Sequence, residues 1–275
     1  YLRGGAERHF FDVSTLLEKN GHTVIPFSMH DERNKKSKYA KYFVSPVHFD
    51  KIDSTTLRRW GRVVYSCEAR RKIKALIKQE KPDIAHVHLM YHHLSPSILL
   101  ELKKAGIPIV FTVHDWQALC PNYNLLLPNG DICTACKNGT YGHVFFKKTI
   151  KQSYGMSGLA AFAGWLHHKR GWDRDTIDRL IMPSQFANNL FGSYGWNTDT
   201  MRVLPHFSDR KPVKAPVKKE AYVLYAGRLS REKGIFKLVQ HWKEYKIEHR
   251  LLIAGRGPEE EKIKILIDGF ENELT

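Results

Sequence analysis

Short apolar runs alternate with amphipathic helical segments along most of this sequence, and that alternation constrains the fold more than any other feature. It is the pattern of a parallel β-sheet whose strands are joined by helices. Residues 107–113 show it most clearly, because Ile-Pro-Ile-Val-Phe-Thr-Val is almost entirely apolar, as a central strand buried on both faces requires. The sequence therefore predicts an α/β fold.

Apolar spacing and helix-ending residues set the bounds of the expected elements. We expect helices from Gly5 to Asn20-Gly21, at 73–80, at 96–104, directly after Ser184, at 234–245 and from 259 onward. We expect strands at 23–27, 84–88, 107–113, 180–182, 222–226 and 250–254. Ser184 is placed to cap the helix that follows it.

Residues 209–220 divide the chain. They are polar and basic and contain Pro212 and Pro216, which is typical of a linker or an exposed crossover. We expect one domain at 1–208 and a second at 221–275. Two strands and two helices are too few for a stable open sheet, so we expect the second domain to continue beyond Thr275. We also expect a strand to precede the Gly4-Gly5 turn.

The formal net charge of +16 bears on partners rather than on the fold. Nucleic acid, an anionic membrane face and a phosphorylated substrate would each suit it, and we favour the last two because no nucleic-acid-binding module is visible. No apolar run of about 18 residues and no secretory signal is present. Four unevenly spread cysteines do not form a disulfide scaffold. We therefore expect a cytoplasmic protein, with a peripheral position at the inner membrane face as a further expectation.

An apolar segment at 156–166 is followed by His-His-Lys-Arg-Gly-Trp and preceded by Lys147, Lys148 and Lys151. This basic and aromatic composition suits a segment that lies in a membrane interface. A helix packed against its own domain is the alternative interpretation, and the one we favour slightly.

The strongest functional motif runs from Gly227 to Gly234. A predicted strand leads into Gly227, and Arg228 and Lys233 then precede a predicted helix. Two fixed cations at a helix start suit a diphosphate, because Arg can bind it through two hydrogen bonds and Lys acts as a point charge. A solvated basic turn is the alternative.

Two glycine-rich turns are weaker signals. Gly4-Gly5 opens the first helix, where a ligand can approach the backbone closely and the helix N-terminus favours an anion; a plain tight turn is the alternative. Residues 255–258, Gly-Arg-Gly-Pro, follow a strand at the edge where open α/β sheets bind ligands. A loop that needs glycine only for its turn is equally favoured there.

His114-Asp115 ends the most apolar predicted strand and is placed to point into a ligand crevice. A core histidine bonded to a backbone carbonyl is the competing interpretation. Four more histidines surround the neighbouring strand: His86, His88, His92 and His93. A metal site is one use for them, but we favour hydrogen bonding to a sugar or acceptor, or a purely structural role.

Cys120, Cys133 and Cys136 could supply three zinc ligands, with Cys67 or His143 as the fourth. Because the sequence does not fix that fourth ligand, we favour free thiols and expect no bound metal.

Taken in order, these motifs resemble the family-four retaining glycosyltransferases of the GT-B fold, which include bacterial polysaccharide and glycolipid mannosyl- and glucosyltransferases. The stretches that carry the resemblance are 4–7, 83–88, 113–115, 119–121, 183–186, 227–234 and 255–258. It implies two Rossmann-like domains facing across a cleft, with the acceptor side at 1–208 and the nucleotide-sugar-binding side at 221–275, the latter incomplete in this chain.

The resemblance also implies residue roles. Arg228 and Lys233 would bind the donor diphosphate and stabilise charge on the leaving group, and His114 would contact the transferred sugar; these three form the catalytic set. Gly255 and Arg256 would lie near the base and ribose. The donor-binding set is Gly4, Gly5, Ser184, Gly227, Arg228, Lys233, Gly255 and Arg256.

The implied reaction moves a hexose from a nucleoside-diphosphate sugar to a glycan or lipid-linked acceptor in cell-surface polysaccharide or glycolipid synthesis, without a further cofactor. The family's pair of second-domain glutamates is expected beyond Thr275, so this chain alone should be inactive. Pro205-His206-Phe207-Ser208 replaces the family's usual Asn-containing turn. The main alternative is a non-catalytic GT-B-like subunit that supports another transferase. The remaining alternatives are a sugar-nucleotide epimerase, a phosphorylase and, least favoured, a nucleic-acid-binding protein.

Overall fold

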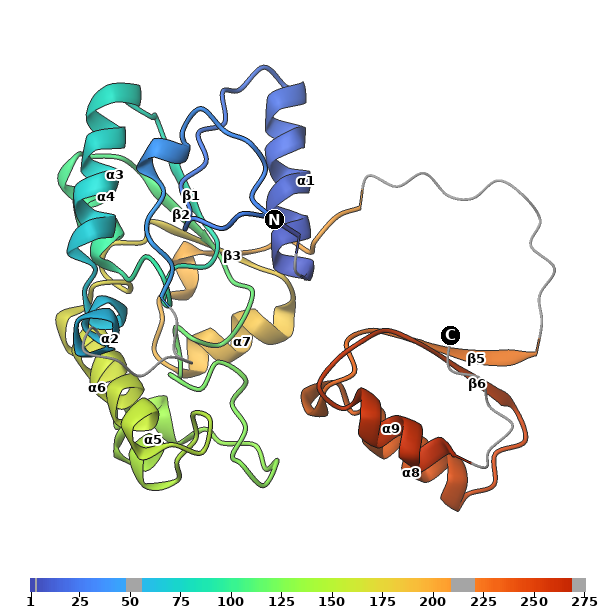
Figure 1. Ribbon diagram of the computed structural model, residues 1–275. Helices are drawn as coiled ribbons and strands as arrows, with labels where there is room; N and C mark the ends of the chain where they lie inside the picture. The colour runs from blue at the N-terminus through green and yellow to red at the C-terminus, as the bar shows by residue number, and fades with distance from the viewer. Residues whose placement is uncertain (3, 48–55, 209–220, 269–275) are drawn as a thin grey trace. The chain divides into compact units, whose positions relative to one another are not determined.

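The computed structural model describes residues 1–2, 4–47, 56–208 and 221–268 (Figure 1). The chain divides into two compact units, unit 1 at Tyr1–Asp209 and unit 2 at Arg210–Thr275. The expected linker at 209–220 lies outside the described residues. Both units combine parallel strands with helices, as the alternating sequence pattern predicts.

Unit 1 is built on a four-stranded sheet in the order β1-β2-β3-β4. The strands are β1 (Ala85–Val87), β2 (Ile109–Thr112), β3 (Arg179–Met182) and β4 (Met201–Val203), and every neighbouring pair is parallel. Ala85 lies opposite Ile109, and Val110 lies opposite Arg179. β2 is thus bonded on both edges, and residues on both of its faces are buried, which explains why its sequence is almost wholly apolar.

In the described residues of unit 1, seven helices surround or extend this sheet. They are α1 (Gly5–Lys19), α2 (Thr56–Val64), α3 (Cys67–Glu80), α4 (Ser97–Lys104), α5 (Gly142–Phe146), α6 (Tyr154–Arg170) and α7 (Gln185–Ser193). α3 packs on α4, and α5 packs on α6 at one end of the unit (Figure 1). Short 3-10 turns occupy Ala40–Tyr42, Ala135–Asn138 and Thr198–Thr200. Among the described residues, no helix is long and apolar enough to cross a membrane.

The strand expected at 23–27 is wrong. Ile25 and Phe27 do pack against the unit 1 core, so the apolar alternation serves burial. The nearest strand-like pairing is an isolated bridge between Met29 and Val44, closed by the bond from Val44 N to Ser28 O. A strand requires a ladder of such bonds, and apolar periodicity alone cannot report whether a neighbouring strand is present.

Side-chain and glycine caps fix the helix ends. Ser66 Oγ accepts from Ala69 N at the start of α3, and Ser184 Oγ accepts from Ala187 N at the start of α7. The second bond confirms the expected cap. α6 ends at Gly171, whose φ of +60° is a left-handed conformation that glycine adopts without strain.

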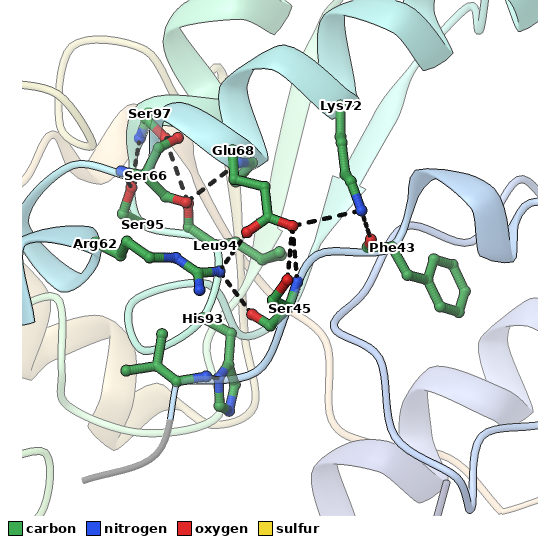
Figure 2. A network of polar contacts seen from close by, with 12 residues as sticks. Phe43, Ser45, Arg62, Ser66, Glu68, Lys72, His93, Leu94, Ser95 and Ser97 are labelled. Atoms are coloured by element: carbon green, nitrogen blue, oxygen red, sulfur yellow. Dashed lines mark hydrogen bonds and ion pairs between the residues drawn. The ribbon is translucent and has the colours of Figure 1, made fainter. Parts of the chain in front are cut away.

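A polar network joins the segment after Phe43 to α2 and α3 (Figure 2). The Glu68 carboxylate accepts from Ser45 N at 2.9 Å and pairs with Arg62 at 2.9 Å and with Lys72 at 3.4 Å. Lys72 also donates to Phe43 O. Burial acts to raise the pKa of Glu68, but the Ser45 bonds and the two cations outweigh it and lower that pKa.

Buried serines continue the network beside it (Figure 2). Ser66 N donates to Ser95 Oγ at 2.9 Å, Ser95 Oγ donates to Ser97 Oγ at 2.9 Å, and Ser97 Oγ donates to Ser66 O at 3.1 Å. All three side chains are fully buried. These bonds satisfy the backbone where α3 and α4 begin, which allows both helix starts to be buried.

Unit 2 contains the parallel strands β5 (Tyr222–Ala226) and β6 (Arg250–Ala254) with helices α8 (Ile235–Glu244) and α9 (Glu260–Ile267). Both strand ranges agree with the sequence-based expectation. Its core is separate from that of unit 1 and comprises Leu229, Ile235, Val239, Trp242, Leu251, Ile253 and Ile263.

We expect Glu68→Ala to lower the free energy of unfolding by about 1–3 kcal/mol, because it leaves Ser45, Arg62 and Lys72 without their shared acceptor. Glu18→Ala, at an exposed position of α1, is the matched control, since both changes replace a helical glutamate by alanine. Urea unfolding of the two variants measures the difference. Equal losses in both would contradict a stabilising role for the network.

Candidate functional site

Five histidines from four parts of the chain meet at the carboxyl end of the unit 1 sheet. They are His9 of α1, His86 in β1, His88 after β1, His114 after β2 and His206 after β4. Parallel strands end at a common edge, so residues that follow them lie close together. His88 Nδ1 lies 2.9 Å from His114 Nε2, and the rings of His9 and His206 lie 3.9 Å apart between centroids.

Burial keeps this histidine cluster uncharged. Burial is the larger cause and repulsion between neighbouring imidazoles the smaller one, and together they lower the pKa of His86 to about 4 and that of His114 to about 3. The pKa of His88 is lowered in the same way. His86 Nε2 is also hydrogen-bonded to Thr112 Oγ1 at 2.7 Å. At neutral pH the cluster therefore offers hydrogen-bonding imidazoles rather than cations.

The sequence identified only part of this cluster. The sequence indicates His114, His86 and His88, and the structure brings them together. His93 lies elsewhere and accepts from Val47 N at 3.1 Å. His9 was missed, although it stands one helical turn after Gly5 on the same face of α1, a spacing that could have indicated it.

His114 does not behave as the competing interpretation required. Its ring nitrogen Nε2 is hydrogen-bonded to the His88 ring rather than to a backbone carbonyl. The adjacent Asp115 accepts from Gln117 N at 3.0 Å, and burial raises the pKa of its carboxyl. His114 is half-buried, so the imidazole is positioned by His88 while part of its surface stays accessible.

The start of α1 leaves space beside its glycines. Gly4 N donates to Glu7 Oε2 at 2.9 Å, which satisfies one free amide of the helix N-terminus. A Cβ placed on Gly5 would meet no atom within 4 Å. Internal packing therefore does not require glycine at position 5. Ser184 is exposed, and its hydroxyl caps α7.

In unit 2 the two glycine-containing loops pack directly on each other. Leu229 N donates to Arg256 O at 3.0 Å. A Cβ on Gly255 would lie 1.8 Å from Gly227 O, and one on Gly257 would lie 2.1 Å from Leu229 O. Loop packing thus explains Gly255 and Gly257 without any ligand. This supports the interpretation that these glycines are needed to form the loop.

The cations expected to bind a diphosphate stand on the exposed side of these loops. Arg228 and Lys233 are both exposed, and Lys233 ends the 3-10 turn Arg231–Lys233 just before α8. Burial acts to raise the pKa of Glu232, but the Ser230 hydroxyl bond at 2.6 Å and the charges of Arg228 and Lys233 lower it. Arg256 on the adjoining loop is exposed as well.

The cysteines and the clustered histidines are the candidate metal ligands of this chain. Within the described ranges, no three His, Cys, Asp or Glu side chains are gathered as metal ligands. Cys120 Sγ and Cys136 Sγ lie 3.0 Å apart, His143 Nε2 lies 3.5 Å from Cys136 Sγ, and Cys133 is half-buried. All four cysteines are free thiols. The zinc alternative therefore has no closed ligand set in the described part of the chain.

Comparisons with known proteins agree with this architecture. Residues 3–211 match the family model for Glycosyltransferase Family 4, and residues 207–273 match that for Glycosyl transferases group 1. No curated protein matches the chain. Among solved structures, the chain is similar to the UDP-N-acetylglucosamine 2-epimerase from Rickettsia bellii, at 12% identity and a TM-score of 0.36. That likeness covers 96% of this chain and 58% of the epimerase, and at this TM-score it indicates nothing about function.

We expect the protein to lose stability as the pH falls below about 6.5, the pKa of imidazole in an unfolded chain. The folded cluster has lowered pKa values, so between pH 6.5 and about 4 the unfolded state binds more protons and the free energy of unfolding decreases. Each such histidine contributes up to about 1.4 kcal/mol per pH unit. Urea unfolding across this range should show a smaller slope for His88→Asn, whereas exposed His22→Asn should keep the wild-type slope.

We expect Gly257→Ala to destabilise the protein by about 1–3 kcal/mol, because its Cβ collides with a backbone oxygen that cannot move freely. Gly5→Ala should change stability little, since nothing occupies that space. Thermal unfolding of both variants makes the test. A Gly257→Ala protein as stable as the wild type would show that the two loops do not pack as described.

Proposed function

This chain belongs to glycosyltransferase family 4 and has the GT-B fold, and we propose that it moves a hexose from a nucleoside-diphosphate sugar to a glycan or lipid-linked acceptor with retention of configuration. The observation that carries the proposal is the exposed pair of cations, Arg228 and Lys233, between β5 and α8. We place the reaction in the cytoplasm, in cell-surface polysaccharide or glycolipid synthesis.

The donor diphosphate is the ligand that suits the loop between β5 and α8. A guanidinium binds phosphate oxygens through two hydrogen bonds, and an ammonium adds a point charge. Both groups are exposed and therefore accessible to a ligand. In the reaction they would stabilise the charge that develops on the nucleoside diphosphate as it leaves.

The histidine cluster suits the sugar. Because the pKa of His114 is lowered to about 3, its ring is neutral at neutral pH and suits an uncharged sugar rather than a phosphate. A neutral imidazole can accept or donate one hydrogen bond to a sugar hydroxyl. His88 fixes the orientation of that ring through the 2.9 Å contact, so His114 would contact the sugar and His88 would act as a positioning residue.

The proposed chemistry breaks the bond between the anomeric carbon and the donor phosphate oxygen. The acceptor hydroxyl attacks that carbon from the face that the phosphate leaves, and the departing phosphate takes the hydroxyl proton. Arg228 and Lys233 supply the electrostatic stabilisation. Gly5 supports donor binding because the space beside it allows close approach to the backbone at the start of α1. The scheme uses no metal and no cofactor besides the nucleotide sugar.

The decisive experiment is calorimetric titration of the full natural chain with UDP-, GDP- and ADP-sugars. We expect one nucleotide class to bind, and Arg228→Ala combined with Lys233→Ala to weaken that binding at least about 100-fold, since each charged hydrogen bond contributes about 1.5–3 kcal/mol. Lys237→Ala, an exposed cation on α8, is the matched control and should bind normally. If the well-folded chain binds no nucleotide sugar, the non-catalytic supporting subunit becomes the better interpretation.

A further inference from the structure

The outer side of α5 and α6 carries a row of exposed aromatic side chains, which we name the α5–α6 aromatic face. Its members are Phe145, Phe146, Tyr154, Phe162 and Trp165. Phe146 is 74% exposed, Tyr154 and Phe162 are each 52% exposed, and Trp165 is 41% exposed. These are large apolar surfaces in contact with water. Their clustering on one helix pair is typical of an interaction site.

The members of this row that belong to α6 lie on one face of that helix because of their spacing. Tyr154, Gly158, Phe162, Trp165 and Lys169 follow at intervals of four, four, three and four residues, which places them on one side of a helix. The opposite side packs inward, where Ser157, Ala163 and His167 are buried. α6 therefore packs on its own unit and also presents an apolar outer face.

The rings contact one another and form two adjoining clusters. Phe145 lies 5.3 Å from Tyr154 and 5.4 Å from Phe146, and Phe162 lies 5.9 Å from Trp165, between ring centroids. Gly158 separates the clusters along α6. A Cβ there would lie 3.2 Å from the Phe145 ring, so α5 sits close against α6.

Cations flank this face, and acidic residues are absent from its sequence. Lys148 Nζ lies 4.2 Å from the centre of the Tyr154 ring, and Lys169 Nζ lies 4.9 Å from that of Trp165. Residues 132–172 contain no Asp or Glu. Their basic residues are Lys137, Lys147, Lys148, Lys151, Lys169 and Arg170. The segment that bears this face therefore combines apolar rings with basic residues and contains no acidic residue.

We propose that the α5–α6 aromatic face docks the protein on an anionic lipid bilayer. The rings would enter the boundary between headgroups and acyl chains, where Trp and Tyr are favoured, and the lysines would contact headgroup phosphates. This goes beyond the proposed transfer reaction and does not depend on it, because the face contains none of the donor-site residues.

A second copy of this chain and a nucleic acid are the two other partners to consider for this face, and both suit it less well. Two copies of this face would bring like charges together, which opposes self-association. A nucleic acid would suit the lysines, but single strands are bound in grooves with separate stacking platforms, whereas these rings pack against one another on the outer side of a helix. An anionic bilayer suits both groups, because the rings can enter the boundary between headgroups and acyl chains while the cations contact headgroup phosphates.

The test is sedimentation of the protein with phosphatidylcholine vesicles that contain or lack phosphatidylglycerol. We expect binding only to the anionic vesicles, weakening as salt is raised. The triple variant Phe146→Ser, Phe162→Ser, Trp165→Ser should bind at least about 10-fold more weakly, since each buried ring contributes apolar area. Lys148→Gln with Lys169→Gln should weaken binding about 30-fold.

Matched controls keep the test specific. Tyr245→Ser removes an equally exposed ring from unit 2, and Lys78→Gln with Lys104→Gln removes the same charge from exposed positions of α3 and α4; both should bind as the wild type does. Circular dichroism should show that all variants are folded. The proposal is overturned if anionic vesicles do not bind at low salt, if the control pair weakens binding as much as the test pair, or if the triple variant binds normally.

A second measurement identifies the inserted ring directly. Vesicle binding should shift tryptophan fluorescence to shorter wavelength, and Trp165→Phe should abolish most of that shift while preserving sedimentation. Titration of the triple variant with nucleotide sugars separates the two proposals, because donor binding should be unchanged. A fluorescence shift that survives Trp165→Phe, or binding to polyglutamate as tight as to vesicles, would count against the lipid surface.

Discussion

The parallel hydrogen bonding of β2 to strands on both sides is the constraint on which unit 1 depends. It places β2 inside the sheet, where both faces of the strand are buried, and it aligns the carboxyl ends of β1, β2 and β3 at one edge. His88 and His114 follow two of these strands and are thereby held 2.9 Å apart. His9 from α1 and His206 from beyond β4 complete a cluster that no local segment of the chain contains.

The candidate functional residues of the two units differ in charge. Burial in unit 1 lowers the pKa of clustered imidazoles until they are neutral, whereas unit 2 keeps Arg228 and Lys233 exposed and charged. A nucleotide sugar also has an uncharged part and a charged part, since its sugar is uncharged and its diphosphate is anionic. Each residue group therefore has an environment that suits the role we propose for it, and each is built by its own unit.

Glycine shows why a shared residue type does not imply a shared role. Gly255 and Gly257 are required because another loop's backbone occupies the space where a Cβ would stand. At Gly5 the same space is open. In the sequence, all three are glycines of a turn or of a helix start. Only the contacts across the fold show that packing requires glycine at positions 255 and 257 and not at position 5. The same holds for α6, whose two faces have different surroundings.

The sequence alone determined the α/β class, most strand and helix positions, and the cationic loop between β5 and α8, because these follow from local periodicity and from neighbouring residues. The strand expected at 23–27 could not be judged locally, since a strand exists only through its hydrogen-bonded neighbour. Tertiary structure alone decided the membership of the histidine cluster and its neutral state, because burial and proximity depend on residues far apart in the chain. It also decided which face of α6 meets water, through the packing of Ser157, Ala163 and His167 against the rest of unit 1.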